Sequence, residues 1–243
     1  MVKSKSFRLP FIKKEKVAQN TYTFYFDRST NSFDFIPGQY MRVTIPHDNP
    51  DERGTSRYFT ITSSPLEKKY LVITTKLVQS TFKETLHTVK QGDQIQFFGP
   101  MGWFLLPKDE QVEKVFLAGG IGITPFHSLF HTFVNETLTQ PMTLFASFSK
   151  REDVLFYESL QEIARKNKQI RVIYTLTQEK SSLDWKGETG RISHELVKKY
   201  VSELHKKVFY IVGAPKMVVE TKAMLLTIGI PDEQIQVEDF TGY

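Results

Sequence analysis

The feature that most constrains the fold is a change of rhythm near residue 107. Before it, short segments rich in aromatic and β-branched residues alternate with turns, as in "NTYTFYFD" (20–27) and "YLVITTK" (70–76). After it, apolar strand-like runs alternate with helical periods, as in "KVFLAG" (114–119) and "TPFHSLFHTFV" (124–134). The first pattern favours a small antiparallel barrel or sandwich. The second favours a parallel sheet with helices on both faces.

The boundary between the two patterns falls in "FLLPKDEQVEK" (104–114), where apolar rhythm gives way to charge and a proline. A chain of 243 residues has room for two domains of ordinary size. One helix interrupts the first pattern, because "STFKETLHTVK" (80–90) carries Phe82, Leu86 and Val89 at helical spacing.

Composition excludes several classes of protein. The chain has no cysteine, so it has no disulfide, no thiolate nucleophile and no cysteine-ligated iron–sulfur cluster. No run approaches ~18 apolar residues, so we expect no membrane span, and we expect a cytoplasmic protein. The net charge of +5 could serve nucleic acid or an acidic protein partner. The aromatics fall in predicted strand cores, however, so we expect no nucleic-acid binding. His127 and His131 are expected on a polar helix face, and we expect no metal site.

The strongest local signal is "FLAGGIGITPF" (116–126), in which an apolar strand ends and a helix begins. Gly119, Gly120 and Gly122 remove Cβ atoms where the backbone must come close to something else. Thr124 is predicted to cap the following helix, whose N-terminal amides favour an anion. A tight turn could need one glycine for packing alone, but three beside a cap favour a nucleotide. The spacing is not G-x-G-x-x-G, so the ordinary dinucleotide fingerprint is absent.

A second unusual stretch is "GTSRYFTITSSP" (54–65), which opens a strand with a charge beside two rings. Arg57 could bind phosphate oxygens bidentately, and Tyr58 or Phe59 could lie on an aromatic ring system. Thr60 could offer a hydroxyl to a ring nitrogen. A flavin dinucleotide has these features, but an ordinary edge strand with an exposed arginine explains the residues equally well.

Taken together, the motifs resemble those of the ferredoxin–NADP reductase family of flavoproteins. The flavin motif Arg-x-Tyr-Ser/Thr stands here as Arg57-Tyr58-Phe59-Thr60. The other matching segments follow in the family's order: "FIPGQY" (35–40), "STFKETLHTVKQGD" (80–93), Gly99 to Gly102, Gly119 to Pro125, Gly213 to Met217, and Glu238 to Tyr243. No single motif is decisive, but the ordered set covers nearly the whole chain and is very specific.

The resemblance implies a two-domain fold. Residues 1–107 would form an N-terminal six-stranded antiparallel β-barrel that binds FAD. Residues 112–243 would form a C-terminal α/β domain with a five-stranded parallel sheet that binds NAD(P). Both expectations agree with the two rhythms described above.

The resemblance also implies roles for individual residues. Arg57 would hold the FAD pyrophosphate with Ser80 and Thr81, Phe59 would stack on the isoalloxazine, and Thr60 would reach its N5 atom. Thr60, Thr124 and Phe240 are the residues expected at the reacting atoms, where Phe240 or Tyr243 would cover the flavin. Further cofactor contacts are predicted at Tyr58, Thr75, Lys76, Phe82, Gly119, Gly120, Gly122, Gly213 and Met217.

The nucleotide preference is predicted from the segment "SFSKRED", which follows the second parallel strand. A 2′-phosphate calls for cationic or polar side chains there, and Ser149, Lys150 and Arg151 supply them. A solvated loop would explain the same residues. We therefore expect NADP as the second cofactor, with NAD possible.

The implied activity is hydride transfer between NAD(P)H and FAD, followed by electron transfer to a separate acceptor such as ferredoxin or flavodoxin. Phe59 replaces the usual tyrosine and Val212 a frequent cysteine, so a hydroxyl bond and thiol assistance are not expected. No iron–sulfur domain accompanies the motifs, and we expect a monomer. Two alternatives remain open: the reductase subunit of a multi-component oxygenase or other redox complex, and a non-catalytic flavin- or nucleotide-sensing module.

Overall fold

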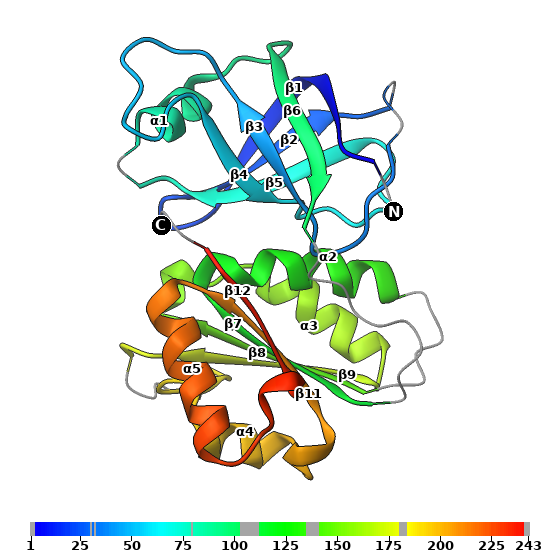
Figure 1. Cartoon of the computed structure of the whole chain (residues 1–243), viewed down its shortest axis with the longest axis vertical. Coiled ribbons are helices and arrows are strands. Elements are labelled where there is room, and N and C mark those ends of the chain that lie inside the picture. Colours follow the sequence, from blue (N-terminus) through cyan, green and yellow to red (C-terminus); the bar gives the residue numbers. More distant parts are fainter. Residues whose placement is uncertain are drawn as a thin grey trace. The chain divides into compact units, whose positions relative to one another are not determined.

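The structure is a computed structural model, and it describes residues 3–29, 31, 33–78, 80–102, 112–134, 141–179 and 184–240. The chain divides into two compact units. The first, called the barrel unit, comprises Met1–Leu105 and Thr124–Thr132, and the second, called the parallel unit, comprises Leu106–Ile123 and Phe133–Tyr243. Figure 1 shows the sheet of each unit. The boundary predicted between residues 107 and 112 falls almost wholly outside the described residues.

The described residues of the barrel unit form six antiparallel strands in the order β4-β3-β6-β1-β2-β5, which confirms the predicted architecture. The strands are β1 (Lys5–Ala18), β2 (Thr21–Asp27), β3 (Tyr40–Thr44), β4 (Ser56–Thr60), β5 (Tyr70–Lys76) and β6 (Gln94–Met101). Ile61, directly after β4, forms a bridge with Ile73 of β5, so the two edge strands approach each other.

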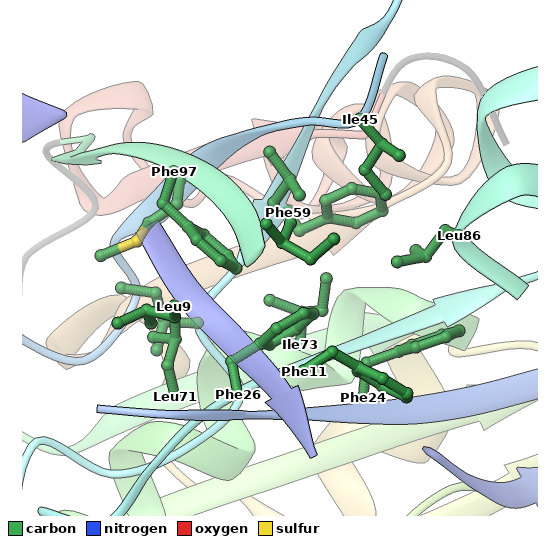
Figure 2. Packing of buried hydrophobic residues seen from close by; sticks show 14 of the residues in the cluster. Leu9, Phe11, Phe24, Phe26, Ile45, Phe59, Leu71, Ile73, Leu86 and Phe97 are labelled. Atoms are coloured by element: carbon green, nitrogen blue, oxygen red, sulfur yellow. The ribbon is translucent and has the colours of Figure 1, made fainter. Parts of the chain in front are cut away.

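The core of the barrel unit is built from alternate residues of these strands, because successive side chains of a strand point to opposite faces. Phe24 and Phe26 of β2 are fully buried, and the ring of Phe26 meets that of Phe97 edge-on at 4.9 Å. The predicted helix is present as α1 (Thr81–Thr88), and it covers one side of this core with Leu86 and Phe82. Figure 2 shows the packed residues.

In the parallel unit, the residues that the structure describes form a six-stranded sheet in the order β10-β9-β8-β7-β11-β12, with every neighbouring pair parallel. The strands are β7 (Lys114–Gly119), β8 (Met142–Phe148), β9 (Ile170–Leu176), β10 (Glu188–Thr189), β11 (Val208–Gly213) and β12 (Ile235–Asp239). The predicted count of five was one too low. The extra strand, β10, has two residues beside Gly190, too few for any periodicity to indicate a strand.

Helices cover both faces of the parallel sheet. The helices of the second half are α2 (Thr124–Phe133), α3 (Tyr157–Lys166), α4 (His194–Tyr200) and α5 (Pro215–Thr227), with 3₁₀ turns η1 (Gly120–Ile123), η2 (Arg151–Asp153), η3 (Leu204–Lys206) and η4 (Asp232–Gln234). Val197 of α4 and Val218 of α5 share a core cluster with Leu117. On the other face, α3 packs through Tyr157, whose ring lies 4.9 Å from that of Tyr174.

Helix α2 groups with the barrel unit, although the sequence placed it within 112–243. Ser128 Oγ donates to the carbonyl of Ser63 at 2.6 Å, and His127 Nδ1 lies 2.9 Å from the carbonyl of Thr62. Burial, with the nearby His131, lowers the pKa of His127 to about 3, so its imidazole is neutral. Thr124 is the first residue of the helix and not its cap, because η1 runs directly into it.

None of the described helices has the length and apolar character that a membrane crossing requires. Within the same part of the chain, no group of three or more histidine, aspartate or glutamate side chains is arranged to hold a metal ion.

Candidate functional site

Arg57 lies near the start of β4, and the backbone of the preceding loop holds its guanidinium. Nη1 donates to the carbonyl oxygens of Arg53 (3.0 Å), Gly54 (2.9 Å) and Ser56 (2.7 Å). The side chain is only 10% exposed, and its Nε is buried with no hydrogen-bond partner among the described residues. A fixed guanidinium with an unsatisfied donor suits an anion that offers several oxygens.

The second nitrogen of this guanidinium joins the residues predicted to bind phosphate. Arg57 Nη2 donates to Asp51 Oδ1 at 2.5 Å and to Ser80 Oγ at 3.3 Å. Ser80 Oγ donates to Asp51 Oδ2 at 3.2 Å, and Thr81 Oγ1 accepts the backbone N–H of Asp51 at 3.0 Å. Arg57 and Ser80 thus both donate to the carboxylate of Asp51, whereas Thr81 bonds to the backbone N–H of the same residue. Because these donors already satisfy one anionic group, they fit the diphosphate of FAD.

Lys83 is a cation in this region that the sequence analysis did not identify. It lies on α1 and is 2% exposed, and its Nζ donates to the carbonyl of Lys76 at 3.0 Å. Burial, together with the charges of Arg53 and Arg57, lowers the pKa of Lys83 to about 8. Its position next to Phe82 in an amphipathic helix carries no sequence signal for burial of a charge.

The two adjacent rings of β4 point in opposite directions. Phe59 is 2% exposed and packs in the barrel core, with its ring 5.9 Å from that of Phe82. Tyr58 is 59% exposed and meets the ring of Tyr40 edge-on at 5.8 Å. The ring of this pair that a flat ligand can reach is therefore that of Tyr58, whereas the resemblance assigned the stacking role to Phe59.

The remaining predicted FAD contacts lie on the facing edge strands or next to them. Thr60 ends β4 and is 8% exposed. Thr75 on β5 is fully buried, and Lys76 beside it offers its carbonyl to Lys83. Phe82 on α1 is fully buried against Phe59. These residues lie on or beside the two edge strands, and the side chains of Thr60, Thr75 and Phe82 are buried.

The glycine stretch forms a tight turn at the carboxyl end of β7. Gly120 has a φ of +54°, a left-handed conformation that side chains disfavour, and the space beside it is open. A Cβ added to Gly122 would lie 2.3 Å from the carbonyl oxygen of Val212, so the backbones of η1 and β11 are in direct contact there. The turn therefore needs Gly122 for packing and leaves open space beside Gly120.

The later motif joins the same turn. Strands β7 and β11 are neighbours, and Met217 near the start of α5 places its Sδ 3.2 Å from a Cβ built on Gly119 and 3.0 Å from one built on Gly213. Phe240 follows β12, and its N–H donates to the carbonyl of Gly213 at 2.9 Å. Four predicted residues from three separate motifs, Gly119, Gly213, Met217 and Phe240, thus lie together at the carboxyl end of the parallel strands.

Glu238 lies in β12 beside Val212 of β11. Its Oε2 is buried and has no hydrogen-bond partner within the described part of the chain. Burial, with the neighbouring Asp239, raises the pKa of Glu238 to about 7. A carboxyl that is about half protonated at neutral pH therefore lies beside Val212, whose carbonyl contacts the glycine turn.

The residues predicted for a 2′-phosphate follow β8, and one of them has an acidic partner. Ser149 and Lys150 are exposed. Glu179, which follows the neighbouring strand β9, accepts the backbone N–H of Arg151 at 3.0 Å and lies 3.3 Å from its Nε. The guanidinium also lies 5.8 Å from the ring centre of Trp185. The sequence analysis missed Glu179, because its partner lies 28 residues away in the chain.

Comparison with known families agrees with this geometry. Residues 8–105 match the oxidoreductase FAD-binding domain, and residues 116–223 match the oxidoreductase NAD-binding domain. The two matches together account for most of the chain. The chain belongs to the ferredoxin–NADP reductase-like flavoproteins, which are oxidoreductases that bind FAD and NAD(P).

Among curated relatives, the chain is similar to a subunit of the Na(+)-translocating NADH-quinone reductase of Shewanella denitrificans. The two are 28% identical over 159 residues, which is 64% of this chain and 39% of the relative. The chain therefore spans about two fifths of the length of that relative.

Two solved structures show the same fold. Amycolatopsis cytochrome P450 reductase GcoB matches with a TM-score of 0.86 and 19% identity, over 100% of this chain and 72% of GcoB. A ferredoxin NADP+ reductase from Neisseria gonorrhoeae, solved with bound FAD and NADP, matches with a TM-score of 0.78 and 24% identity. That match covers 97% of this chain and 98% of the reductase.

Proposed function

We propose that this chain takes hydride from a reduced nicotinamide nucleotide onto FAD and passes the electrons singly to a separate acceptor. The observation that carries the proposal is that Arg57 and Ser80 both donate to one anionic group in the FAD-binding domain, with Thr81 bonded to the backbone of the same residue. Bound FAD supplies both hydride acceptance and one-electron donation.

The residues of the chain would bind FAD and the nicotinamide nucleotide and would orient them for hydride transfer. Arg57, Ser80 and Thr81 hold the diphosphate, and Tyr58 replaces Phe59 in our proposal as the ring that contacts the flavin, because its face is exposed. Thr60 at the end of β4 orients the reacting edge of the ring system. In the parallel unit, Gly120 and the turn around it receive the nicotinamide nucleotide. The proposed domain extents remain residues 1–107 and 112–243.

In place of the NADP expected from Ser149, Lys150 and Arg151, we propose NADH as the preferred nucleotide. The carboxylate of Glu179 beside Arg151 offsets the charge that a 2′-phosphate would need, and a carboxylate accepts hydrogen bonds from a ribose 2′-hydroxyl. Ser149 and Lys150 remain proposed contacts of the same ribose.

The acceptor we propose is a protein with a one-electron centre: a ferredoxin, a flavodoxin or an oxygenase component. The likeness to GcoB, a cytochrome P450 reductase, supports it. A second candidate is a quinone, favoured by the likeness to a subunit of an NADH-quinone reductase. Stopped-flow reoxidation of the NADH-reduced protein by ferredoxin, flavodoxin and a soluble quinone, without oxygen, distinguishes them by rate.

The flavin site is tested by Arg57→Ala, with Arg8→Ala, an exposed arginine of β1, as the matched control. We expect the wild type and the Arg8 variant to purify with flavin absorbance bands or to take up added FAD. The Arg57 variant should lose about 100-fold in FAD affinity, since a charged hydrogen-bonding donor to phosphate is removed. Equal FAD affinity in all three proteins would disprove the assignment.

A further inference from the structure

The carboxylate of Asp51 contacts the same donors that are proposed to bind the FAD diphosphate. One of its oxygens accepts from Arg57 Nη2 at 2.5 Å and from the backbone N–H of Arg53 at 3.0 Å. The other accepts from Ser80 Oγ at 3.2 Å and lies 3.7 Å from Arg53 Nη2. Asp51 thus occupies the place that an anionic oxygen of a ligand would take.

Arg57 does not need Asp51 to hold its position. Three backbone carbonyls already accept from Nη1 and fix the plane of the guanidinium. Asp51 instead satisfies the other nitrogen, which together with the buried Nε forms the edge available to a bidentate anion. The ion pair therefore satisfies a ligand-binding edge in addition to any structural role.

The surrounding charges show that one carboxylate does not neutralise this region. The charges of Arg53 and Arg57 act on Lys83, and Asp51 forms ion pairs with both arginines. Burial alone would raise the pKa of Asp51, but the hydrogen bonds from Arg57, Arg53 and Ser80 lower it below its usual value. The carboxylate is therefore ionised at neutral pH and competes as an anion.

The backbone of Asp51 is anchored separately from its side chain. Its N–H donates to Thr81 Oγ1 at 3.0 Å, so the loop stays attached to α1 when the carboxylate turns. The side chain is 17% exposed, and rotation about its own bonds can carry it toward solvent. Release of Arg57 thus requires movement of one side chain and no rearrangement of the loop.

We propose that Asp51 is an internal competitor of the FAD diphosphate: its carboxylate occupies Arg57 and Ser80 in the flavin-free protein and must leave them when FAD binds. This inference rests on the proposed function, since it takes the Arg57 site to be the diphosphate site. Asp51 stabilises the flavin-free protein and weakens its affinity for FAD.

The test compares Asp51→Asn with Asp48→Asn, which removes the same charge from an exposed residue of the same loop. Flavin-free proteins are titrated with FAD and with riboflavin, which has no phosphate, by following flavin fluorescence. We expect Asp51→Asn to bind FAD about tenfold more tightly than the wild type, because a competing charge-assisted contact is weakened. Riboflavin affinity should not change, and Asp48→Asn should match the wild type with both ligands.

A second readout is the melting temperature of the flavin-free proteins, which should fall in Asp51→Asn because Arg57 loses its charged partner. If Asp51→Asn does not fold, Asp51→Ser is measured in the same way. FAD binding that is unchanged or weaker in the Asp51 variant would overturn the competitor role and place the carboxylate among the ligands of bound FAD or outside the site. Failure of the wild type and both variants to bind FAD would instead overturn the proposed function.

Discussion

The two units prepare their proposed cofactor sites in different ways. In the barrel unit the site consists of charged and hydroxyl side chains, with Arg57, Ser80 and Asp51 already bonded to one another. In the parallel unit the site consists mainly of backbone, where Gly120 leaves open space and Gly122 touches the carbonyl of Val212. The first site is therefore sensitive to charge and the second to volume.

The same contrast holds for the buried ionisable group beside each site. The barrel unit buries Lys83, whose pKa is lowered to about 8, and the parallel unit buries one carboxylate oxygen of Glu238, whose pKa is raised to about 7. Each pKa is shifted in the direction that favours the neutral form of the side chain, because burial penalises charge of either sign. The two units should consequently respond to pH in opposite directions.

The largest expected effect is a change of volume in the parallel unit. In Gly122→Ala the new Cβ would lie 2.3 Å from a backbone oxygen, so strand β11 or the turn must move. We expect a loss of at least ~3 kcal/mol of stability, measured by urea unfolding.

Gly120→Ala is the control for that experiment. It adds the same atom to a neighbouring position of the turn, where nothing lies within 4 Å and only the φ of +54° is unfavourable. It should cost about 1 kcal/mol. Equal losses in the two variants would show that backbone conformation, and not contact with β11, explains the glycines.

The second-largest expected effect is a gain of stability when Lys83 of the barrel unit is replaced by methionine. The pKa of Lys83 falls from 10.5 to about 8 on folding, so between these values the unfolded chain binds more protons and stability rises with pH. Below pH 8, a pKa shift of that size means that charged Lys83 destabilises the folded protein by about 3 kcal/mol. Replacing Lys83 also loses its hydrogen bond to the Lys76 carbonyl, which reduces the gain by about 1 kcal/mol. Lys83→Met in flavin-free protein should therefore be about 2 kcal/mol more stable than wild type at pH 7.

That advantage should shrink as the pH approaches 10.5, where both states of the wild type lose the proton. Urea unfolding at neutral pH and again near the upper end of that interval measures the change. An advantage that is the same at both values would mean that packing of the methionine, and not the charge of Lys83, causes it.

The opposite sign is expected for Glu238→Gln in the parallel unit. The pKa of Glu238 rises from 4.5 to about 7 on folding, so the folded state binds more protons in that interval and wild-type stability falls as the pH rises through 7. Glutamine mimics the protonated carboxyl. The variant should match the wild type at about pH 4.5 and exceed it by about 1–2 kcal/mol at about pH 8. A gain that does not depend on pH would contradict the displaced pKa.

The residues proposed to bind FAD could be predicted from the sequence, whereas the charged residues that contact or surround them could not. Arg57, Ser80 and Thr81 were predicted from ordered motifs, and the structure brings them together. Asp51 lies in the polar turn "NPDERG", where acidic residues are common and no periodicity distinguishes one from another. Lys83 could not be predicted either, because its burial depends on strands that are distant in the sequence.

The ring pair shows where a resemblance and simple geometry diverge. Neighbouring residues of a strand point to opposite faces, so Tyr58 and Phe59 cannot both face a ligand. β4 pairs with β3, and the alternation that buries Met41 and Val43 also buries Phe59. By the same alternation Arg57 and Phe59 share one face of β4, so the pattern alone does not show which ring is accessible, and the packing of Phe59 in the barrel core does. The two-residue strand β10 has no such pattern to apply.

The smallest expected effect concerns the preference of the parallel unit for NADH or NADPH, which removal of one carboxylate charge tests. Glu179→Gln keeps the side-chain shape but removes the charge that offsets Arg151. We expect kcat/KM for NADPH to rise about threefold to tenfold relative to that for NADH, since an exposed charge contributes ~1 kcal/mol. Steady-state rates with an artificial electron acceptor measure the ratio. Glu152→Gln, a neighbouring acidic residue of η2, is the control and should leave the ratio unchanged. If Glu179→Gln also leaves the ratio unchanged, the charge of Glu179 does not discriminate between NADH and NADPH.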